Sequence, residues 1–205
     1  MKHLYIIRHG ETDFNKTQKM QGRGIDASLN ELGRYQAQAV ADSLQKVAIT
    51  KIVTSSLKRT LETAQPLITQ SGASVESHRD LDEMSFGSLE GKEFHLVKDE
   101  IKYLHTNWTQ GNLDVKPDNG ESPKEVYDRA HSRVMEILLN SDDEHIAFVI
   151  HGRLIRILLS EWLGFGLSNM DRIEHSNGAI NKLFWTGNEF NPITLNMLDH
   201  LKIEV

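Results

Sequence analysis

Short, continuous runs of apolar residues alternate along the chain with longer stretches in which apolar and polar positions recur at helical spacing. The runs at 4–7, 51–55 and 146–150 contain Ile or Val, and a weaker one lies at 73–78. Runs of this kind are typical of strands that are buried on both faces. We therefore predict four strands with helical segments between them.

Helix-start signals mark where the first helical segments begin. Residues 28–31 have the Ser-x-x-Glu spacing of a capping box, so we expect a helix from there to about Lys46. Ser56 is placed to cap the next helix, which Pro66 is expected to interrupt or kink. A third segment, 93–108, is helical by its periodicity alone.

The second half of the chain gives clearer signals. Residues 122–125 form another capping box, with Pro123 at the first helical position, where its missing N–H costs nothing. This helix should run to about Leu139. A further helix is expected after the strand at 146–150, ending near Gly164.

The order of these elements defines the fold class. Strands that alternate with helices indicate βαβ units, and hence a three-layer α/β/α sandwich with a mostly parallel central sheet. Segments 180–186 and 192–198 flank a Gly-Asn pair and predict a closing hairpin. We expect a single domain over residues 1–205, with a cap-like helical and loop segment at about 84–120.

Composition narrows the classes of partner. The chain has 205 residues, 39% hydrophobic and 25% charged, which is the usual balance for a globular protein. Its net charge of −6 gives no general attraction to nucleic acid or to an anionic membrane, so we expect neither as a partner. The absence of cysteine excludes disulfides and thiolate catalysis. No apolar run has the length of a signal-peptide core or a membrane span, so we expect a cytoplasmic location.

Three of the predicted strands lead into residues suited to anion chemistry. Arg8 and His9 follow the first strand, Arg59 lies at the start of the helix after the second, and His151 follows the strand at 146–150. A glycine follows each of these histidines. The carboxyl ends of parallel strands share one edge of a sheet, where open α/β folds bind ligands. Because guanidinium groups match phosphate oxygens in pairs, we predict a phosphate site at this edge.

The two histidines could instead be plain packed side chains or ligands of a metal ion. A lone histidine after a strand is most often packed or exposed, but here each lies beside an arginine and a glycine. His9, His151 and Glu11 could coordinate a cation, yet the flanking arginines would repel one and no aspartate cluster offsets them. We therefore expect no metal and no cofactor, and interpret Glu11 as a partner that positions the arginines of the pocket.

The sequence Arg-His-Gly-Glu-Thr at residues 8–12, with Asn15 three residues on, resembles the signature of the histidine phosphatase superfamily, also called the phosphoglycerate mutase-like family. Supporting matches occur in order along nearly the whole chain. They are Gln21-Gly22, Leu29, Gly33, residues 55–60, Thr63-Ala64, Glu83, Phe86-Gly87, Glu90-Gly91, residues 120–122 and His151-Gly152.

This resemblance implies a role for each residue of the pocket. His9 would attack phosphorus and become a phosphohistidine. Glu83 would act as general acid on the leaving oxygen and then as base for the attacking water, with its neighbour Asp82 as the alternative. The residues implied to hold the phosphoryl group are Arg8, Arg59, His151, Asn15, Gln21, Gly22 and Gly152.

The segment after the implied acid distinguishes classes within the family. Mutases of this family carry paired arginines there in a longer insertion, whereas residues 94–117 contain no arginine. Hydrolysis is therefore favoured, and a substrate with two anionic groups is disfavoured. Residues 81–87 and 108–121 are similar to the alpha-ribazole phosphatases, so we predict alpha-ribazole 5′-phosphate, an intermediate of cobalamin biosynthesis, as substrate and inorganic phosphate as product. Trp108 could stack on its base, although an isolated tryptophan is more often packed.

Other functions remain as alternatives. The core motifs bind phosphate and do not select the leaving group, so they also fit a broad-specificity phosphatase or a phosphoglycerate mutase. A non-enzymatic phosphate-binding module would need neither a nucleophile nor an acid, and the pair His9 and Glu83 argues against it. The sequence gives no indication of the oligomeric state.

Overall fold

The structure, a computed structural model, describes residues 1–201 and is built on a six-stranded sheet in the order β3-β2-β4-β1-β5-β6. Four neighbouring strands pair in parallel: β3 (Ser74–His78), β2 (Lys51–Ser55), β4 (His145–Ile150) and β1 (Lys2–Arg8). The hairpin of β5 (Ile180–Trp185) and β6 (Phe190–Met197) completes the sheet, with β5 antiparallel to β1. The mostly parallel sheet that the alternation of elements predicted is confirmed.

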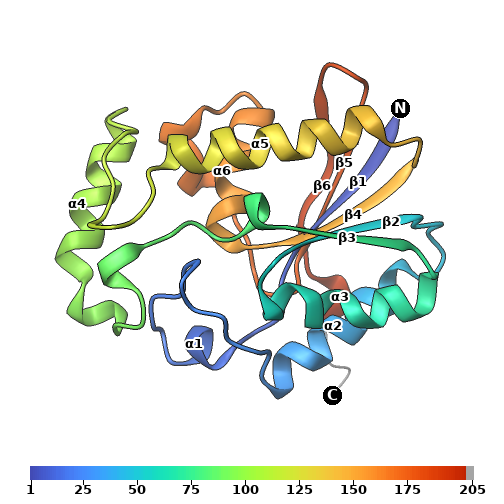
Figure 1. Ribbon diagram of the computed structural model, residues 1–205, viewed down its shortest axis with the longest axis horizontal. Helices are drawn as coiled ribbons and strands as arrows, with labels where there is room; N and C mark the ends of the chain where they lie inside the picture. The colour runs from blue at the N-terminus through green and yellow to red at the C-terminus, as the bar shows by residue number, and fades with distance from the viewer. Residues whose placement is uncertain (202–205) are drawn as a thin grey trace.

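Helices cover both faces of this sheet, which gives the predicted three layers (Figure 1). In the view of Figure 1, α2 (Glu31–Leu44) and α3 (Lys58–Ser71) lie below the sheet, and α5 (Pro123–Asn140) and α6 (Gly152–Trp162) lie above it. Helix α4 (Lys98–Thr109), within the segment expected to form a cap, stands to one side. A short helix, α1 (Asp13–Lys16), follows β1.

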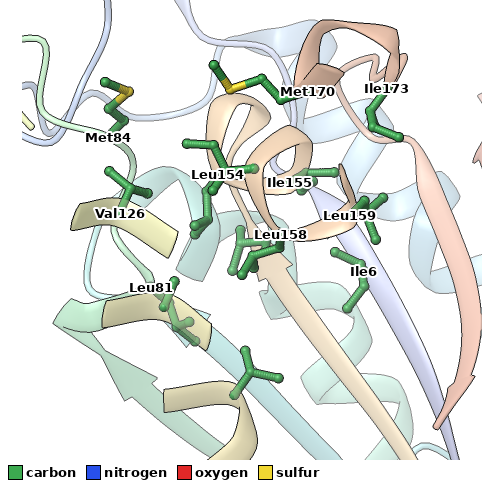
Figure 2. Packing of buried hydrophobic residues seen from close by; sticks show 14 of the residues in the cluster. Ile6, Leu81, Met84, Val126, Leu154, Ile155, Leu158, Leu159, Met170 and Ile173 are labelled. Atoms are coloured by element: carbon green, nitrogen blue, oxygen red, sulfur yellow. The ribbon is translucent and has the colours of Figure 1, made fainter. Parts of the chain in front are cut away.

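The continuous apolar strands supply a core to each face, because successive side chains point to opposite sides. Leu4 and Ile6 belong to the cluster under α5 and α6, which Figure 2 shows around Ile6 and Leu158. Tyr5 and Ile7 belong to the cluster over α2 and α3. Burial on both faces explains why β1 carries no polar residue between Leu4 and Ile7.

The structure corrects two of the predicted helix starts. Helix α2 begins at Glu31, and the side chain of Asn30 caps it by accepting from the Gly33 N–H at 2.9 Å, so the capping box predicted at residues 28–31 is wrong. Ser56 does not cap α3, because its N–H and hydroxyl donate to Asp82 instead, at 2.9 and 2.8 Å.

The remaining helix predictions differ from the structure mainly at their ends. The capping box at Ser122 is present, with Pro123 in the first turn of α5. Pro66 lies inside α3, which continues to Ser71. The segment expected to be helical from residue 93 begins with a 3-10 turn, and α4 starts only at Lys98. Across residues 1–201, no helix is both long enough and apolar enough to cross a membrane.

Candidate active site

The carboxyl ends of β1, β4 and β2 meet at one edge of the sheet, as the parallel pairing requires. Arg8 and Ile150 are register partners at the ends of β1 and β4, which places His9 next to His151. The two imidazole rings lie with their centroids 5.2 Å apart. Helix α3, which begins just after β2, adds Arg59 to the same place. The predicted histidines and arginines therefore converge.

His9 is buried, and its surroundings fix which ring nitrogen carries the proton. The Nδ1–H donates to the carbonyl of Gly10 at 2.7 Å, which leaves the lone pair on Nε2. Burial, and then the positive charges of Arg59 and Arg8, hold the pKa of His9 well below its usual value. The ring is therefore neutral, with a nitrogen able to act as a nucleophile.

Arg59 is fully buried and donates to three acceptors. Its Nε donates to Nδ1 of His151 at 3.2 Å, and its terminal nitrogens donate to the carbonyls of Ile25 at 2.7 Å and Gly22 at 3.3 Å. Because Nδ1 of His151 accepts, its Nε2 carries the proton and donates to the Ser55 hydroxyl at 2.7 Å. Both ring nitrogens of His151 are thus occupied by protein, and this histidine orients Arg59.

Two of the predicted site residues have a buried N–H group with no acceptor among residues 1–201: Arg8 at Nε and Gln21 at Nε2. The carbonyl oxygen of Gln21 accepts from the Thr12 hydroxyl at 2.8 Å, so the amide nitrogen is its remaining group. Asn15 is held in a similar way, because its Oδ1 accepts from the Thr12 N–H at 3.1 Å. Buried donors are costly unless an acceptor meets them, and an oxyanion such as phosphate supplies several.

The predicted site glycines are positions of close approach. A Cβ at Gly152 would lie 3.0 Å from Nε of Arg8, and a Cβ at Gly22 would overlap the carboxylate of Glu90. Any larger residue at either position would displace a charged side chain. Gly152 therefore lets the guanidinium of Arg8 lie against the first turn of α6.

Glu83 is buried and its carboxylate is held by three backbone N–H groups. Oε1 accepts from Met84 at 2.9 Å and from Leu154 at 3.0 Å, and Oε2 accepts from Arg153 at 3.0 Å. The last two donors belong to the first turn of α6, whose dipole also favours a negative charge there. Burial lowers the pKa of Arg8 to about 10, and the charge of Glu83 opposes that shift most, so this carboxylate lies close to the predicted phosphate pocket.

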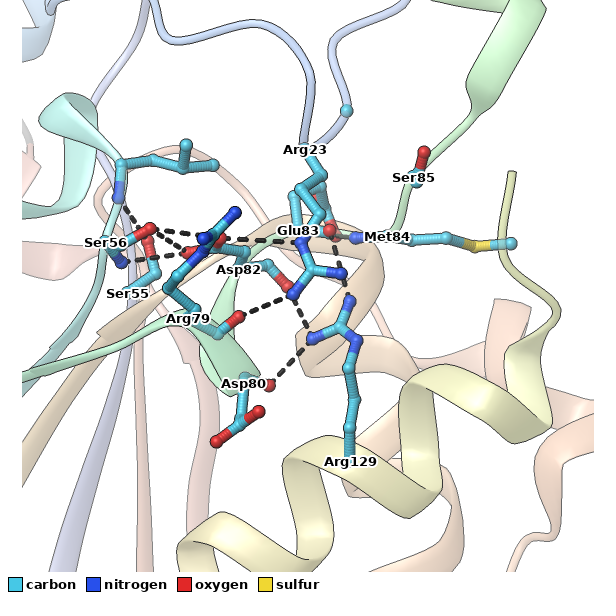
Figure 3. A network of polar contacts seen from close by, with 12 residues as sticks. Arg23, Ser55, Ser56, Arg79, Asp80, Asp82, Glu83, Met84, Ser85 and Arg129 are labelled. Carbon is cyan, nitrogen blue, oxygen red and sulfur yellow. Dashed lines mark hydrogen bonds and ion pairs between the residues drawn. The ribbon is translucent and has the colours of Figure 1, made fainter. Parts of the chain in front are cut away.

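One arginine of α5 fixes the loop that carries Glu83, as Figure 3 shows. Arg129 donates through Nη1 to the carbonyls of Asp80 at 2.7 Å and Asp82 at 3.0 Å. Its Nη2 donates to the carbonyl of Glu83 at 3.2 Å. A single guanidinium thus holds three carbonyls of this loop, so the position of the Glu83 backbone depends on a side chain from another layer.

Glu121 ties together the two ends of the segment that follows Glu83. Its carboxylate accepts from the N–H of Ser85 at 2.8 Å, and its own N–H donates to the Ser85 carbonyl at 2.9 Å. The same carboxylate pairs with Nε of Arg129 at 2.7 Å. The loop of Glu83 and the end of the following segment are therefore joined by two hydrogen bonds, and the ion pair with Arg129 holds Glu121 in place.

Asp82, the alternative acid, is occupied elsewhere. Its Oδ1 accepts from the N–H and hydroxyl of Ser56, and Arg23 lies 3.5 Å from Oδ2. Glu83, by contrast, lies against α6 and acts electrostatically on Arg8. The geometry favours Glu83 as the group that serves the pocket.

Two residues of the loop before β5 also belong to the site, although the sequence did not single them out. Nη1 of Arg8 donates to Nδ1 of His175 at 2.8 Å, and the side-chain amide of Asn177 donates to the His9 carbonyl at 3.0 Å. The sequence predicted the hairpin but not the strand with which it pairs, so it carried no signal for these two residues. Because β5 runs antiparallel to β1, the residues before β5 must lie at the carboxyl end of β1.

The structure corrects two interpretations of single residues. Glu11 does not position an arginine, because its Oε1 accepts from the side-chain amide of Asn30 at 2.8 Å. Trp108 is buried, with its indole N–H donating to the Val115 carbonyl at 2.8 Å, so it cannot stack on a substrate base. Among residues 1–201, no three His, Asp or Glu side chains converge in a way that could hold a metal ion.

The pH dependence of stability should report on His175. Burial, and then the charge of Arg8, lower its pKa from 6.5 to about 2, so below pH 6.5 the unfolded chain binds a proton that the folded chain does not. Stability therefore falls as the pH drops through 6.5, by about 2 kcal/mol from this group at pH 5. We expect urea unfolding at pH 8 and pH 5 to show a correspondingly smaller loss in His175→Gln than in the wild type.

His95 provides a matched control for this measurement, because its side chain is 69% exposed. His95→Gln should retain the loss of stability that the wild type shows between pH 8 and pH 5. If His175→Gln also retained the full loss, the assignment of a neutral, half-buried His175 would be wrong.

Comparison with known proteins adds to this geometry. The sequence profile of the histidine phosphatase superfamily (branch 1) matches residues 4–197. A curated relative named putative phosphoserine phosphatase 2, from Hydrogenobacter thermophilus, is 29% identical over 202 residues, which is 98% of each chain.

Solved structures show the same architecture. Mycobacterial glucosyl-3-phosphoglycerate phosphatase is 28% identical and has a TM-score of 0.86, covering 96% of this chain and 99% of that one. A putative alpha-ribazole-5′-P phosphatase from Escherichia coli has a TM-score of 0.84 over 96% of both chains. Its identity of 22% supports the shared fold alone.

Proposed function

The chain belongs to the histidine phosphatase superfamily, branch 1, and is a phosphatase; we propose that it hydrolyses a small-molecule phosphate ester through a phosphohistidine on His9. The observation that carries this proposal is the state of His9. The ring is buried and neutral, and the Gly10 carbonyl holds the proton on Nδ1. Nε2 is therefore available to bond to phosphorus, which is what covalent phosphoryl transfer needs.

In the first step Nε2 of His9 forms a bond to phosphorus while the bond from phosphorus to the ester oxygen breaks. Glu83 gives its proton to the leaving oxygen, which departs as an alcohol. Arg8 and Arg59 stabilise the charge on the phosphoryl oxygens, and the unpaired Nε2 of Gln21 adds a neutral donor. His151 contributes by holding the guanidinium of Arg59.

In the second step water attacks the phosphohistidine. Glu83, now a carboxylate, takes a proton from this water as its oxygen bonds to phosphorus and the bond to Nε2 breaks. Inorganic phosphate leaves, and His9 returns to its neutral form. The same carboxyl group thus serves as acid and then as base, so the cycle needs no further proton carrier.

Activity should survive exhaustive removal of divalent metal. In the proposed mechanism arginine side chains provide the positive charge, so no step depends on a cation. We expect hydrolysis of p-nitrophenyl phosphate to keep its rate after dialysis against EDTA, compared with a sample dialysed without chelator. A loss of activity that Mg²⁺ or Mn²⁺ restores would contradict this mechanism.

Two candidate substrates follow from different observations. Alpha-ribazole 5′-phosphate rests on the similarity of residues 81–87 and 108–121, and the burial of Trp108 removes base stacking from its support. A phosphorylated carboxylic acid is the second candidate. Phosphoserine and phosphoglycerate, which occur in the names of two relatives, both carry a carboxylate, and two arginines of α6 lie beside the pocket.

A kinetic screen of phosphomonoesters tests the proposed function. It should include p-nitrophenyl phosphate, alpha-ribazole 5′-phosphate, 3-phosphoglycerate and glycerol 3-phosphate, with release of inorganic phosphate as the measurement. We expect phosphate release from at least one natural ester. Transfer of phosphate within 3-phosphoglycerate without release would instead identify a mutase, and binding without turnover would identify a phosphate-binding module.

A further inference from the structure

A second group of basic side chains lies next to the predicted phosphate pocket, at the start of α6. Arg8 and His175 both pack over Gly152, since a Cβ there would lie 3.0 Å from each of them. Arg153 and Arg156 are three residues apart and so lie on one face of α6. Because helical side chains point back toward the N-terminus, Arg156 extends over the same first turn as Gly152.

Electrostatic interactions show that this group and the pocket are close to each other. Burial is the main reason that the pKa of Arg8 is lowered, and the positive charge of Arg156 lowers it further. The carboxylate of Glu83 raises the pKa of both Arg8 and Arg156, against the effect of burial. Arg156 therefore lies close enough to the acid and to Arg8 for its charge to act on both.

The two arginines of α6 share a single ion-pair partner. Arg153 and Arg156 donate to the same oxygen of Asp171, at 2.8 and 2.7 Å, so a single carboxylate serves two guanidinium groups. Arg153 also contacts His105 and the ring of Trp108. Nε of Arg156, in contrast, is buried and has no acceptor within residues 1–201.

We infer that Arg156, with Arg153 beside it, binds a carboxylate on the leaving group, so that the preferred substrates are phosphate esters of hydroxy acids. A planar guanidinium matches a carboxylate, and Arg156 extends over the first turn of α6, against which Arg8 and the Glu83 carboxylate also lie. The absence of arginine from residues 94–117 disfavoured a second anionic group, but α6 supplies arginines from a different element. This inference rests on the proposed function, because the carboxylate is placed relative to the bound phosphate.

The test compares two ligands that differ in one group. 3-Phosphoglycerate has a carboxylate where glycerol 3-phosphate has a hydroxymethyl group. Their inhibition constants against hydrolysis of p-nitrophenyl phosphate give a ratio that does not require either ligand to be turned over. We expect the wild type to prefer 3-phosphoglycerate, and Arg156→Gln to reduce that preference roughly 10–100-fold, as for loss of a hydrogen bond to a charged group.

Two further variants distinguish specific binding of the carboxylate by Arg156 from the general effect of losing one positive charge. Arg34→Gln removes one exposed guanidinium from α2 and should keep the wild-type ratio. Arg156→Lys retains the charge without the planar fork and should restore part of the preference. A wild-type ratio near one, or a ratio that Arg156→Gln leaves unchanged, would overturn the inference.

Failure of the carboxylate inference can be distinguished from failure of the proposed function. If the wild type does not hydrolyse p-nitrophenyl phosphate at all, the proposed phosphatase mechanism fails. The two dissociation constants are then measured by calorimetry, and the same ratio decides whether Arg156 binds the carboxylate.

Discussion

His9→Asn should lower kcat/KM for p-nitrophenyl phosphate by at least about 10⁴-fold, because it removes the proposed nucleophile, on which both chemical steps would depend. Asparagine is the best replacement, since its amide can still donate to the Gly10 carbonyl that His9 Nδ1 contacts. It therefore removes the reactive Nε2 with little change to the surrounding backbone. Steady-state kinetics and thermal unfolding of the same sample give the two values needed.

A labelling experiment tests directly for the proposed covalent intermediate. Wild type mixed with ³²P-labelled substrate and quenched in alkaline detergent should retain label, because a phosphohistidine is stable in alkali and labile in acid. His9→Asn should retain none, and His95→Asn, at an exposed histidine, should behave as the wild type. A His9→Asn protein with more than a few per cent of the activity would exclude His9 as the nucleophile.

Glu83→Gln should have an effect that depends on the leaving group. An alkyl phosphate such as glycerol 3-phosphate needs a proton on its departing oxygen, so formation of the phosphoenzyme should slow roughly 10²–10⁴-fold. A nitrophenolate leaves without that proton, so the same step with p-nitrophenyl phosphate should slow far less. The measurement is the burst phase, because Glu83 is also proposed to activate water in the second step.

The contacts of Glu83 define the control for this experiment. Its two oxygens accept from three backbone N–H groups, and the amide nitrogen of glutamine cannot accept any of them, so thermal stability must be compared alongside the rates. Equal losses in the burst rate for the two esters would point to a structural role. Asp82→Asn is the matched variant, and a leaving-group dependence there would move the acid to Asp82.

The sheet and the convergence of His9, Arg59 and His151 could be predicted, because both depend on short-range patterns. An apolar run long enough for one strand, followed by a helical period, implies a parallel βαβ unit, and parallel strands necessarily end at one edge. Each of these three residues directly follows such a strand or begins the next helix. Their positions along the chain were therefore sufficient to predict that they meet at one edge of the sheet.

Contacts made across the fold could not be predicted in this way. His175 meets Arg8 from 167 residues away in sequence, and Arg129 reaches the Glu83 loop from another layer. No local pattern records such pairs. The cap predicted at Ser56 was wrong for a related reason. Serine is a good capping residue, but the Asp82 carboxylate accepts hydrogen bonds from both the N–H and the hydroxyl of Ser56. Tertiary contacts here outweigh local preference.

The joining of Ser85 to Glu121 has a consequence for how enzymes of this architecture can diversify. Residues 86–120, which include α4, form a segment whose two ends are joined by two hydrogen bonds between Ser85 and Glu121 and by the Glu121 ion pair with Arg129, all made outside the segment itself. Closing a loop of twice the length costs only about 0.6 kcal/mol more. Insertions or deletions within 86–120 can therefore be accommodated without moving Glu83, so that this segment can vary while the proposed reaction chemistry stays the same.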